Sequence, residues 1–282
     1  MIKIFRDQHD YVLQNSQQAI RVNDFSFDQL FRSADPVDYA RQFFDADGIS
    51  QVDIQTLQTH PWLAPIANQE VWAAGVTYFR SRSARMEESE QSGGDRFYDM
   101  VYEAERPELF FKATGPRSRG HLAKVCIRTD STWDVPEPEL TLAINQAGKI
   151  FGYTIGNDMS SRSIEGDNPL YLPQAKVYRG SCAIGPCLTI NESDDVITKE
   201  SEIKIAIQRG DKEMFSGSTE VSQIKRSFEE LAKYLFQDNE FPDGAYLMTG
   251  TGVVPESDFT LQSGDAIHIA IDGLGQLSNT VE

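Results

Sequence analysis

The chain has 282 residues, of which 40% are hydrophobic, so it is long enough for a sizeable core and has the composition of an ordinary globular protein. Acidic residues outnumber basic ones by 43 to 26, and the net charge of −17 repels phosphate backbones and anionic membrane surfaces. These numbers argue against nucleic acid or a membrane as a partner.

The amino-terminal segment is typical of a strand. Residues 1–6 (MIKIFR) lack the long apolar core of a signal peptide, and no apolar run in the chain approaches the roughly 18 residues of a spanning helix. Three cysteines are an odd number, which argues against a disulfide framework, and four scattered histidines lack the spacing of zinc ligands. We therefore expect a soluble, cytoplasmic protein.

Residues 1–65 are predicted to form a small N-terminal α/β domain, with the catalytic domain spanning residues 66–282. Ser26 to Gln29 resembles a capping box, and Asp35-Pro36 places a proline in the first turn of a second helix that should end near Gly48. Pro61 and Pro65 mark the passage into the larger domain.

The larger domain is predicted to be predominantly β. Short strands are expected at residues 71–76, 109–112, 203–209 and 266–271, and one amphipathic helix at residues 224–236. The polar run from Glu87 to Asp95 suggests a lid. Many strands with few helices predict an α+β fold built on a mixed sheet.

The central stretch of the chain carries two carboxylates that alternate with prolines. Glu137 and Glu139 precede an apolar, strand-like run, and in extended backbone they project to one face with Pro138 on the other. A second strand-like run, from Ile150 to Ile155, ends before Asp158, so pairing of the two strands would gather three oxygen ligands for a hard cation such as Mg²⁺. The alternative is that Glu137 and Glu139 are solvated charges on an edge strand.

The order of several short segments resembles the fumarylacetoacetate hydrolase family from about Val71 to the C-terminus. The matching segments are residues 75–78 (GVTY), 110–112 (FFK), 137–140 (EPEL), 152–160 (GYTIGNDMS), Lys176, 185–186 (GP) and 264–265 (GD). The resemblance implies the family's mixed-sheet β roll. It also implies that Glu137, Glu139 and Asp158 hold Mg²⁺, or alternatively Ca²⁺ or Mn²⁺.

Within that family the chain is most similar to the 2-keto-3-deoxy-D-arabinonate dehydratases. The segments that carry this similarity are residues 106–114 (RPELFFKAT), Trp133 ahead of the 136–140 segment, and residues 168–176 (NPLYLPQAK). The resemblance implies a metal-dependent hydro-lyase of pentose catabolism that converts a 2-keto-3-deoxy-pentonate to 2,5-dioxopentanoate and water. It also implies a homodimer or homotetramer.

One position departs from the family's hydrolases and decarboxylases. They carry a histidine three residues after the tyrosine of the Gly-x-x-Tyr segment, where this chain has Ser81. A serine without a base does not generate hydroxide near neutral pH. The departure argues against an acylpyruvate-type C–C hydrolase or an oxaloacetate decarboxylase, which are the alternatives within the fold.

Lys176 is the candidate base for the C3 proton, since a lysine that faces a divalent cation in a partly desolvated pocket has a lowered pKa. The alternative is an exposed lysine. Glu108 is the candidate acid for the leaving hydroxyl, although a buried salt bridge to Arg106 or Lys112 explains it equally well. The remaining candidates for substrate binding are Gly75, Tyr78, Arg80, Ser81, Lys112, Thr251 and Gly252.

Overall fold

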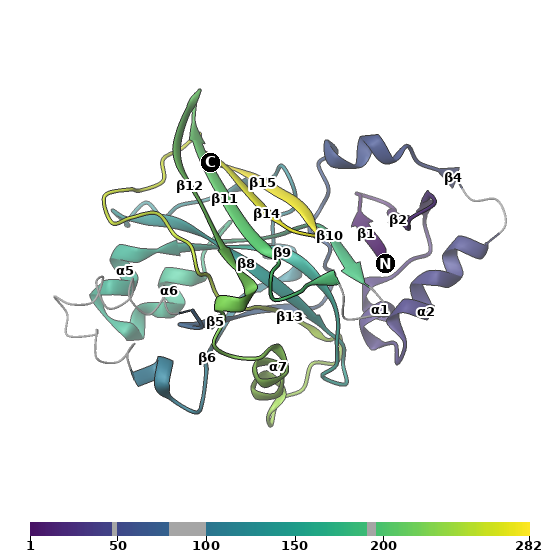
Figure 1. The fold of residues 1–282 in the computed structure, drawn as a ribbon, viewed down its shortest axis with the longest axis horizontal. Helices are drawn as coiled ribbons and strands as arrows, with labels where there is room; N and C mark the ends of the chain where they lie inside the picture. The colour runs from purple at the N-terminus through teal and green to yellow at the C-terminus, as the bar shows by residue number, and fades with distance from the viewer. Residues whose placement is uncertain (47–49, 79–99, 191–195) are drawn as a thin grey trace.

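The computed structural model describes residues 1–46, 50–78, 100–190 and 196–282, and its regular structure is mostly β-strand (Figure 1). The larger sheet has ten strands in the order β4-β3-β2-β1-β10-β9-β8-β13-β5-β6. These strands are β1 (Ile2–Arg6), β2 (Tyr11–Gln14), β3 (Ala19–Val22), β4 (Ser50–Gln51), β5 (Glu70–Gly75), β6 (Glu108–Thr114), β8 (Asp134–Ile144), β9 (Ile150–Ser161), β10 (Cys182–Ile190) and β13 (Ala245–Met248).

The smaller sheet has five strands in the order β12-β11-β14-β15-β7. Its strands are β7 (Lys124–Val125), β11 (Glu202–Arg209), β12 (Lys212–Glu220), β14 (Ala266–Ile271) and β15 (Gly275–Val281). The helices are short: α1 (Phe27–Arg32), α2 (Pro36–Arg41), α5 (Arg162–Asp167), α6 (Leu172–Lys176) and α7 (Phe228–Phe236), with 3₁₀ turns η1 (Gln42–Asp45), η2 (Ile54–Gln58), η4 (Gly115–Arg117), η5 (Pro169–Tyr171) and η7 (Val221–Gln223).

The two sheets pack face to face in the middle of the molecule, where β11, β14 and β15 lie over β8 and β9 (Figure 1). Leu140 and Ile155 of the larger sheet share an apolar core with Ile205 and Ile269 of the smaller one. This core follows from the alternation in β11 and β14, in which every second residue is an isoleucine that points inward. The arrangement confirms the predicted α+β fold dominated by a mixed sheet.

Most of the predicted strands are present within one or two residues of their expected limits. The strand that begins at Ile150 continues to Ser161, well past the predicted end at Ile155, because it pairs with β8 along almost its whole length. Its extension carries Asp158 into the sheet opposite Glu137.

Two helix predictions are wrong at their ends. The late helix begins at Phe228, because the Ser227 hydroxyl caps it by accepting a hydrogen bond from the Glu230 N–H at 3.1 Å. Ile224, the predicted start, instead bridges Tyr78. The second N-terminal helix begins after Asp35 as expected but ends at Arg41, where the 3₁₀ turn η1 follows; Gly48 lies outside the described residues.

The N-terminal segment is joined to the rest of the chain through the sheet. β1 pairs antiparallel with β10, so β1 to β4 extend the large sheet on one side. Phe27 and Phe31 of α1 pack into the same core as Ala143 and Ile184. Residues 1–65 do hold both helices and strands. A domain boundary at residue 65 stays a prediction.

Within the described ranges, no helix combines the length and the apolar composition that crossing a bilayer requires. The three cysteines, Cys126, Cys182 and Cys187, are buried and free.

Candidate metal centre and active site

The antiparallel pairing of β8 and β9 gathers the three predicted carboxylates. Glu137 lies opposite Asp158, and Glu139 lies opposite Gly156. β13 pairs with β8 only over residues 141–144, so Pro136 and Pro138 fall beyond this ladder, where a missing backbone N–H is tolerated. Beyond the end of that ladder, the loop that follows β13 lies beside the carboxylates.

The three carboxylates form one buried cluster. Each offers an oxygen within 4.8 Å of the others, and the exposed fractions of Glu137, Glu139 and Asp158 are 3%, 2% and 0%. Together with Lys176, Gly75 and Thr251 they line a small cavity of about 10 Å³, which we call the carboxylate cavity. Burial excludes the alternative of solvated edge charges, because three anions this close need cations or protons.

Lys176 lies between two of the carboxylates. Its ammonium group donates to Glu137 Oε2 at 2.5 Å and to Asp158 Oδ2 at 3.1 Å, and the side chain is fully buried. The Nζ atom also lies 5.7 Å from the centre of the Phe110 ring. Lys176 is therefore not an exposed lysine, and its amine is within hydrogen-bonding reach of the cluster.

Lys112 lies on β6, and its side chain reaches the carboxylate cluster. Its Nζ forms an ion pair with Asp158 Oδ1 and donates to the backbone carbonyls of Met159 at 3.0 Å and Lys176 at 2.5 Å. These contacts fix the position of Asp158 and of the end of α6. They favour a role for Lys112 in orienting the Asp158 carboxylate, beside its predicted role in substrate binding.

Arg162, at the start of α5, was missed by the sequence analysis. One of its guanidinium nitrogens lies 2.6 Å from Glu137 Oε1, and only 3% of the residue is exposed. Glu165, one turn later, accepts a hydrogen bond from the Ser160 hydroxyl at 2.9 Å. A signal was available, because Asp158, Ser160 and Arg162 alternate and so share one face of an extended chain.

The negative charge of Glu139 is strongly disfavoured at this site. Its Oε2 accepts a hydrogen bond of 2.6 Å from the Gly250 N–H. Burial, and then the negative charges of Asp158 and Glu137, raise the pKa of Glu139 well above its usual range. A divalent cation among the three carboxylates would relieve this repulsion, and three carboxylate oxygens are the donors that Mg²⁺, Mn²⁺ or Ca²⁺ prefers. The residues present therefore fit such an ion.

Glu108 lies at the edge of the site, across from Gly75 in the β5–β6 pair. A Cβ atom placed on Gly75 would come within 2.0 Å of Glu108 Oε2, so the glycine makes room for this carboxylate. Val76, the next residue, has a φ of 53°, a conformation that a β-branched residue rarely adopts. This strained backbone lines the carboxylate cavity together with Phe110.

The loop after β13 closes the other side. The Thr251 hydroxyl donates to the Val253 carbonyl at 3.1 Å, and Thr251 lines the carboxylate cavity. A Cβ on Gly252 would lie 2.3 Å from the Tyr78 ring, so the two residues are in close contact. Burial, and then the negative charge of Glu139, raise the pKa of Tyr78 above its usual range.

Two predicted substrate-binding residues, Arg80 and Ser81, lie outside the described residues, as does the predicted lid at Glu87 to Asp95. The other predicted site residues all lie on the strands and loops around the carboxylate cavity. Their individual roles stay predictions.

The chain is similar in sequence to a known family and to two kinds of dehydratase. Residues 102–282 match the profile of a family described as "Fumarylacetoacetate (FAA) hydrolase C-terminal". The chain is 47% identical over 237 residues to the "Probable 2-keto-3-deoxyxylonate dehydratase" of Haloferax volcanii, covering 84% of this chain and 79% of that protein. It is 36% identical over 295 aligned residues to the "2-dehydro-3-deoxy-D-arabinonate dehydratase" of Saccharolobus solfataricus, covering 100% and 97%.

A solved structure described as "2-keto-3-deoxy-D-arabinonate dehydratase complexed with magnesium and 2,5-dioxopentanoate" has the same fold. The two superpose with a TM-score of 0.81 at 33% identity, covering 100% of this chain and 98% of that one.

Proposed function

The chain belongs to the fumarylacetoacetate hydrolase family, and on that premise we propose that it is a Mg²⁺-dependent dehydratase of a 2-keto-3-deoxy sugar acid. The proposed substrate is a 2-keto-3-deoxy-pentonate such as 2-keto-3-deoxy-D-arabinonate, and the products are 2,5-dioxopentanoate and water. The reaction would serve non-phosphorylative pentose catabolism.

One observation carries the proposal. Glu137, Glu139 and Asp158 form a triad of buried carboxylates, and the buried side-chain nitrogen of Lys176 hydrogen-bonds two of them, Glu137 and Asp158. This arrangement combines a binding site for a hard cation with a candidate base, which are the two parts that removal of a proton beside a keto group requires. The relative complexed with magnesium and 2,5-dioxopentanoate supports the choice of ion and of product class.

Glu137, Glu139 and Asp158 would hold the ion. When bound, it supplies charge stabilisation to the α-keto acid end of the substrate as the C3 proton leaves. Arg162 and Lys112 hold the Glu137 and Asp158 carboxylates in place through their ion pairs. Lys176 would accept the C3 proton in its neutral amine form, and Phe110 is the aromatic side chain beside its Nζ atom.

Loss of the C4 hydroxyl then requires a proton donor, and Glu108 is the candidate. The C4–O bond breaks and the hydroxyl departs as water. Loss of one proton from C5 and of the C5 hydroxyl proton, balanced by protonation at C3 and at C4, leaves the second carbonyl at C5. Gly75 supports this role because it leaves space for the Glu108 carboxylate at the edge of the cavity. Thr251 and Gly252 would hold the substrate carboxylate.

The test offers the purified protein three substrates in parallel: a 2-keto-3-deoxy-pentonate, an acylpyruvate and oxaloacetate. We expect only the first to be consumed, with 2,5-dioxopentanoate formed, and we expect EDTA to abolish and added Mg²⁺ to restore the reaction. Hydrolysis of the acylpyruvate or decarboxylation of oxaloacetate without dehydration would instead support the alternative activities of the fold.

We further propose a cytoplasmic location and assembly as a homodimer or homotetramer. The support for this assembly is the family resemblance. Sedimentation at micromolar concentration tests this assembly, and the presence of only a 31.7 kDa species would contradict it.

A further inference from the structure

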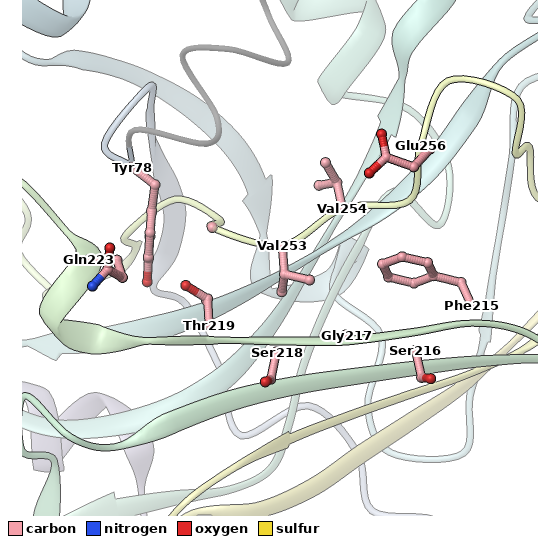
Figure 2. A pocket seen from close by; sticks show the side chains of 11 residues that line it. Tyr78, Phe215, Ser216, Gly217, Ser218, Thr219, Gln223, Val253, Val254 and Glu256 are labelled. Atoms are coloured by element: carbon pink, nitrogen blue, oxygen red, sulfur yellow. The ribbon is translucent and has the colours of Figure 1, made fainter.

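Two cavities outside the candidate active site differ in the charge of their lining. The first has a volume of about 470 Å³ and lies between β12 and the loop that follows β13 (Figure 2). The only charged side chain among its described lining residues is Glu256, which lies at one end of the cavity in Figure 2. The second has a volume of about 670 Å³, and its described lining residues include Lys3 but no arginine, aspartate or glutamate. We call this second cavity the lysine cavity.

The lysine cavity lies where the N-terminal region meets the smaller sheet. Lys3 is on β1 between Ile2 and Ile4, whose side chains enter an apolar core. Because side chains alternate along a strand, the Lys3 side chain leaves the opposite face of the sheet and lines the cavity. Leu57, of η2, and Leu274, of the turn between β14 and β15, line it from two further elements. The cavity therefore depends on the tertiary fold and not on one local segment.

Lys3 brings a positive charge to the cavity, and no carboxylate of the described residues pairs with it. Its Nζ atom donates to the backbone carbonyl of Leu274 at 3.3 Å, which is a long hydrogen bond to a neutral acceptor. Within the described ranges no aspartate or glutamate lies within ion-pairing distance of this half-buried side chain, although the whole chain has 43 acidic residues. An ammonium group has three donors, so two remain for a ligand. A bound anion would use these donors and neutralise the charge.

The lining also contains exposed apolar side chains and a strained residue. Ile54 and Leu122 both line the cavity, and their exposed fractions are 42% and 48%. Leu122 has a φ of 61°, which a bulky residue rarely adopts, and its N–H donates to the Ser278 carbonyl at 2.7 Å. Backbone strain of this kind clusters at ligand sites. The volume of about 670 Å³ is also typical of a site for a small molecule.

We propose that the lysine cavity is a second ligand site, for a small monocarboxylate with an apolar body. The carboxylate pairs with Lys3, and the carbon chain lies against Ile54 and Leu122. One ammonium group neutralises one negative charge, whereas a phosphate needs more cationic or N–H donors than a single lysine offers. The site shares no lining residue with the carboxylate cavity, so it is independent of the proposed reaction.

The test titrates the EDTA-treated protein with three probes at pH 7.5 and follows binding by isothermal titration calorimetry. The probes are hexanoate, hexan-1-ol, which has the same carbon chain without the charge, and inorganic phosphate. Removal of metal ions prevents hexanoate from binding to a cation at the carboxylate triad. We expect hexanoate to bind at one site per chain, hexan-1-ol to bind at least about tenfold more weakly, and phosphate not to bind, because a charge-assisted hydrogen bond is stronger than a neutral one.

Variants of one residue assign the binding to the lysine cavity. Lys3→Met fills similar space without the charge, and should weaken hexanoate binding at least about tenfold while hexan-1-ol binds as before. Unchanged binding of hexan-1-ol also shows that the variant still forms the cavity. Lys3→Arg retains the charge and should stay within a few-fold of the native affinity for hexanoate. Lys212→Met, which removes one positive charge from an exposed position on β12, is the matched control and should change neither affinity.

Three outcomes would overturn the site. Hexanoate could fail to show saturable binding to the native protein, or it could bind Lys3→Met as tightly as the native protein. Equal affinities of the native protein for hexanoate and hexan-1-ol would show that the charge of Lys3 has no part in recognition, and tighter binding of phosphate than of hexanoate would reject a monocarboxylate as the ligand.

Discussion

At the scale of single residues, Lys176 is the group on which the proposed chemistry depends most. Lys176→Met fills similar space without an amine, so the carboxylate triad should survive while proton removal stops. Base catalysis contributes about 10²–10⁴-fold, and we expect a loss of at least that size in both dehydration and exchange of the C3 proton with D₂O. Exchange is followed by NMR on substrate bound with Mg²⁺.

Lys176→Arg tests whether Lys176 acts through its positive charge or as a base. A guanidinium keeps the positive charge beside Glu137 and Asp158 but stays protonated, so it should not rescue the exchange. Normal C3 exchange in the methionine variant would show that the base lies elsewhere, and would leave Lys176 with an orienting role.

The carboxylate triad makes its own prediction. Glu137→Gln, Glu139→Gln and Asp158→Asn each remove one anionic oxygen from a site that needs several, so each should abolish turnover and weaken Mg²⁺ binding at least about tenfold, measured by titration calorimetry. Glu213→Gln, at an exposed position on β12, is the matched control. Near-normal activity in two of the three variants, together with activity after EDTA treatment, would reject the assignment.

The sequence allowed part of this site to be predicted, because alternation in a strand is a local property. Glu137 and Glu139 two residues apart had to share a face once the stretch was extended. The ion pair between Lys112 and Asp158 and the location of Lys176 between Glu137 and Asp158 join segments tens of residues apart. No local pattern encodes such contacts, which depend on which strands pair.

At the scale of elements, the β5–β6 pair controls the position of Glu108. Gly75→Ala introduces a methyl group that would overlap Glu108 Oε2, and the flexible carboxylate end should move aside while the sheet stays paired. We expect kcat to fall about tenfold or more, since general acid catalysis typically contributes at least 10²-fold, with an unchanged circular dichroism spectrum.

A double-mutant cycle identifies the cause. If Gly75→Ala acts by displacing the carboxylate, adding it to Glu108→Gln should cost little further activity. Multiplicative losses in the double variant would mean that the methyl group acts on something else, such as the strained backbone at Val76.

Element limits were predictable where a capping residue marks them. Ser26 and Asp35 cap α1 and α2 through their side chains, as their sequence positions indicated. The start of α7 was misplaced because Ile224 continues the apolar period of the helix, while its backbone is committed to a bridge with Tyr78. Tertiary pairing overrides periodicity at such positions.

At the scale of the whole molecule, His121 connects the N-terminal region with the smaller sheet. Its Nδ1 accepts a hydrogen bond of 3.1 Å from the Ser278 N–H, and its ring also hydrogen-bonds the Gln58 backbone. Both bonds suit the neutral ring, in which Nδ1 accepts and Nε2–H donates. Burial and the nearby His268 lower the pKa of His121, while the Gln58 bond acts in the opposite direction.

The lowered pKa of His121 means that its contribution to folding stability decreases as the pH falls. Because the folded state binds a proton on His121 less readily than the unfolded state, the contribution of this residue is fully present above the unfolded pKa, about 6.5. It is lost as the pH falls through that value toward the lower pKa of the folded state.

His121→Asn tests this link, because the asparagine Oδ1 can still accept from the Ser278 N–H while the bond to Gln58 is lost. Urea denaturation at pH 7.5 should show the variant about 1 kcal/mol less stable, the worth of one hydrogen bond. At pH 5.5 the difference should narrow, because the native protein then carries the cost of charging a buried ring and the variant does not. A difference that stays constant or widens on acidification would show that His121 does not remain neutral in the folded protein. In that case folding does not lower the pKa of His121, and acidification does not weaken the contact between the N-terminal region and the smaller sheet through this residue.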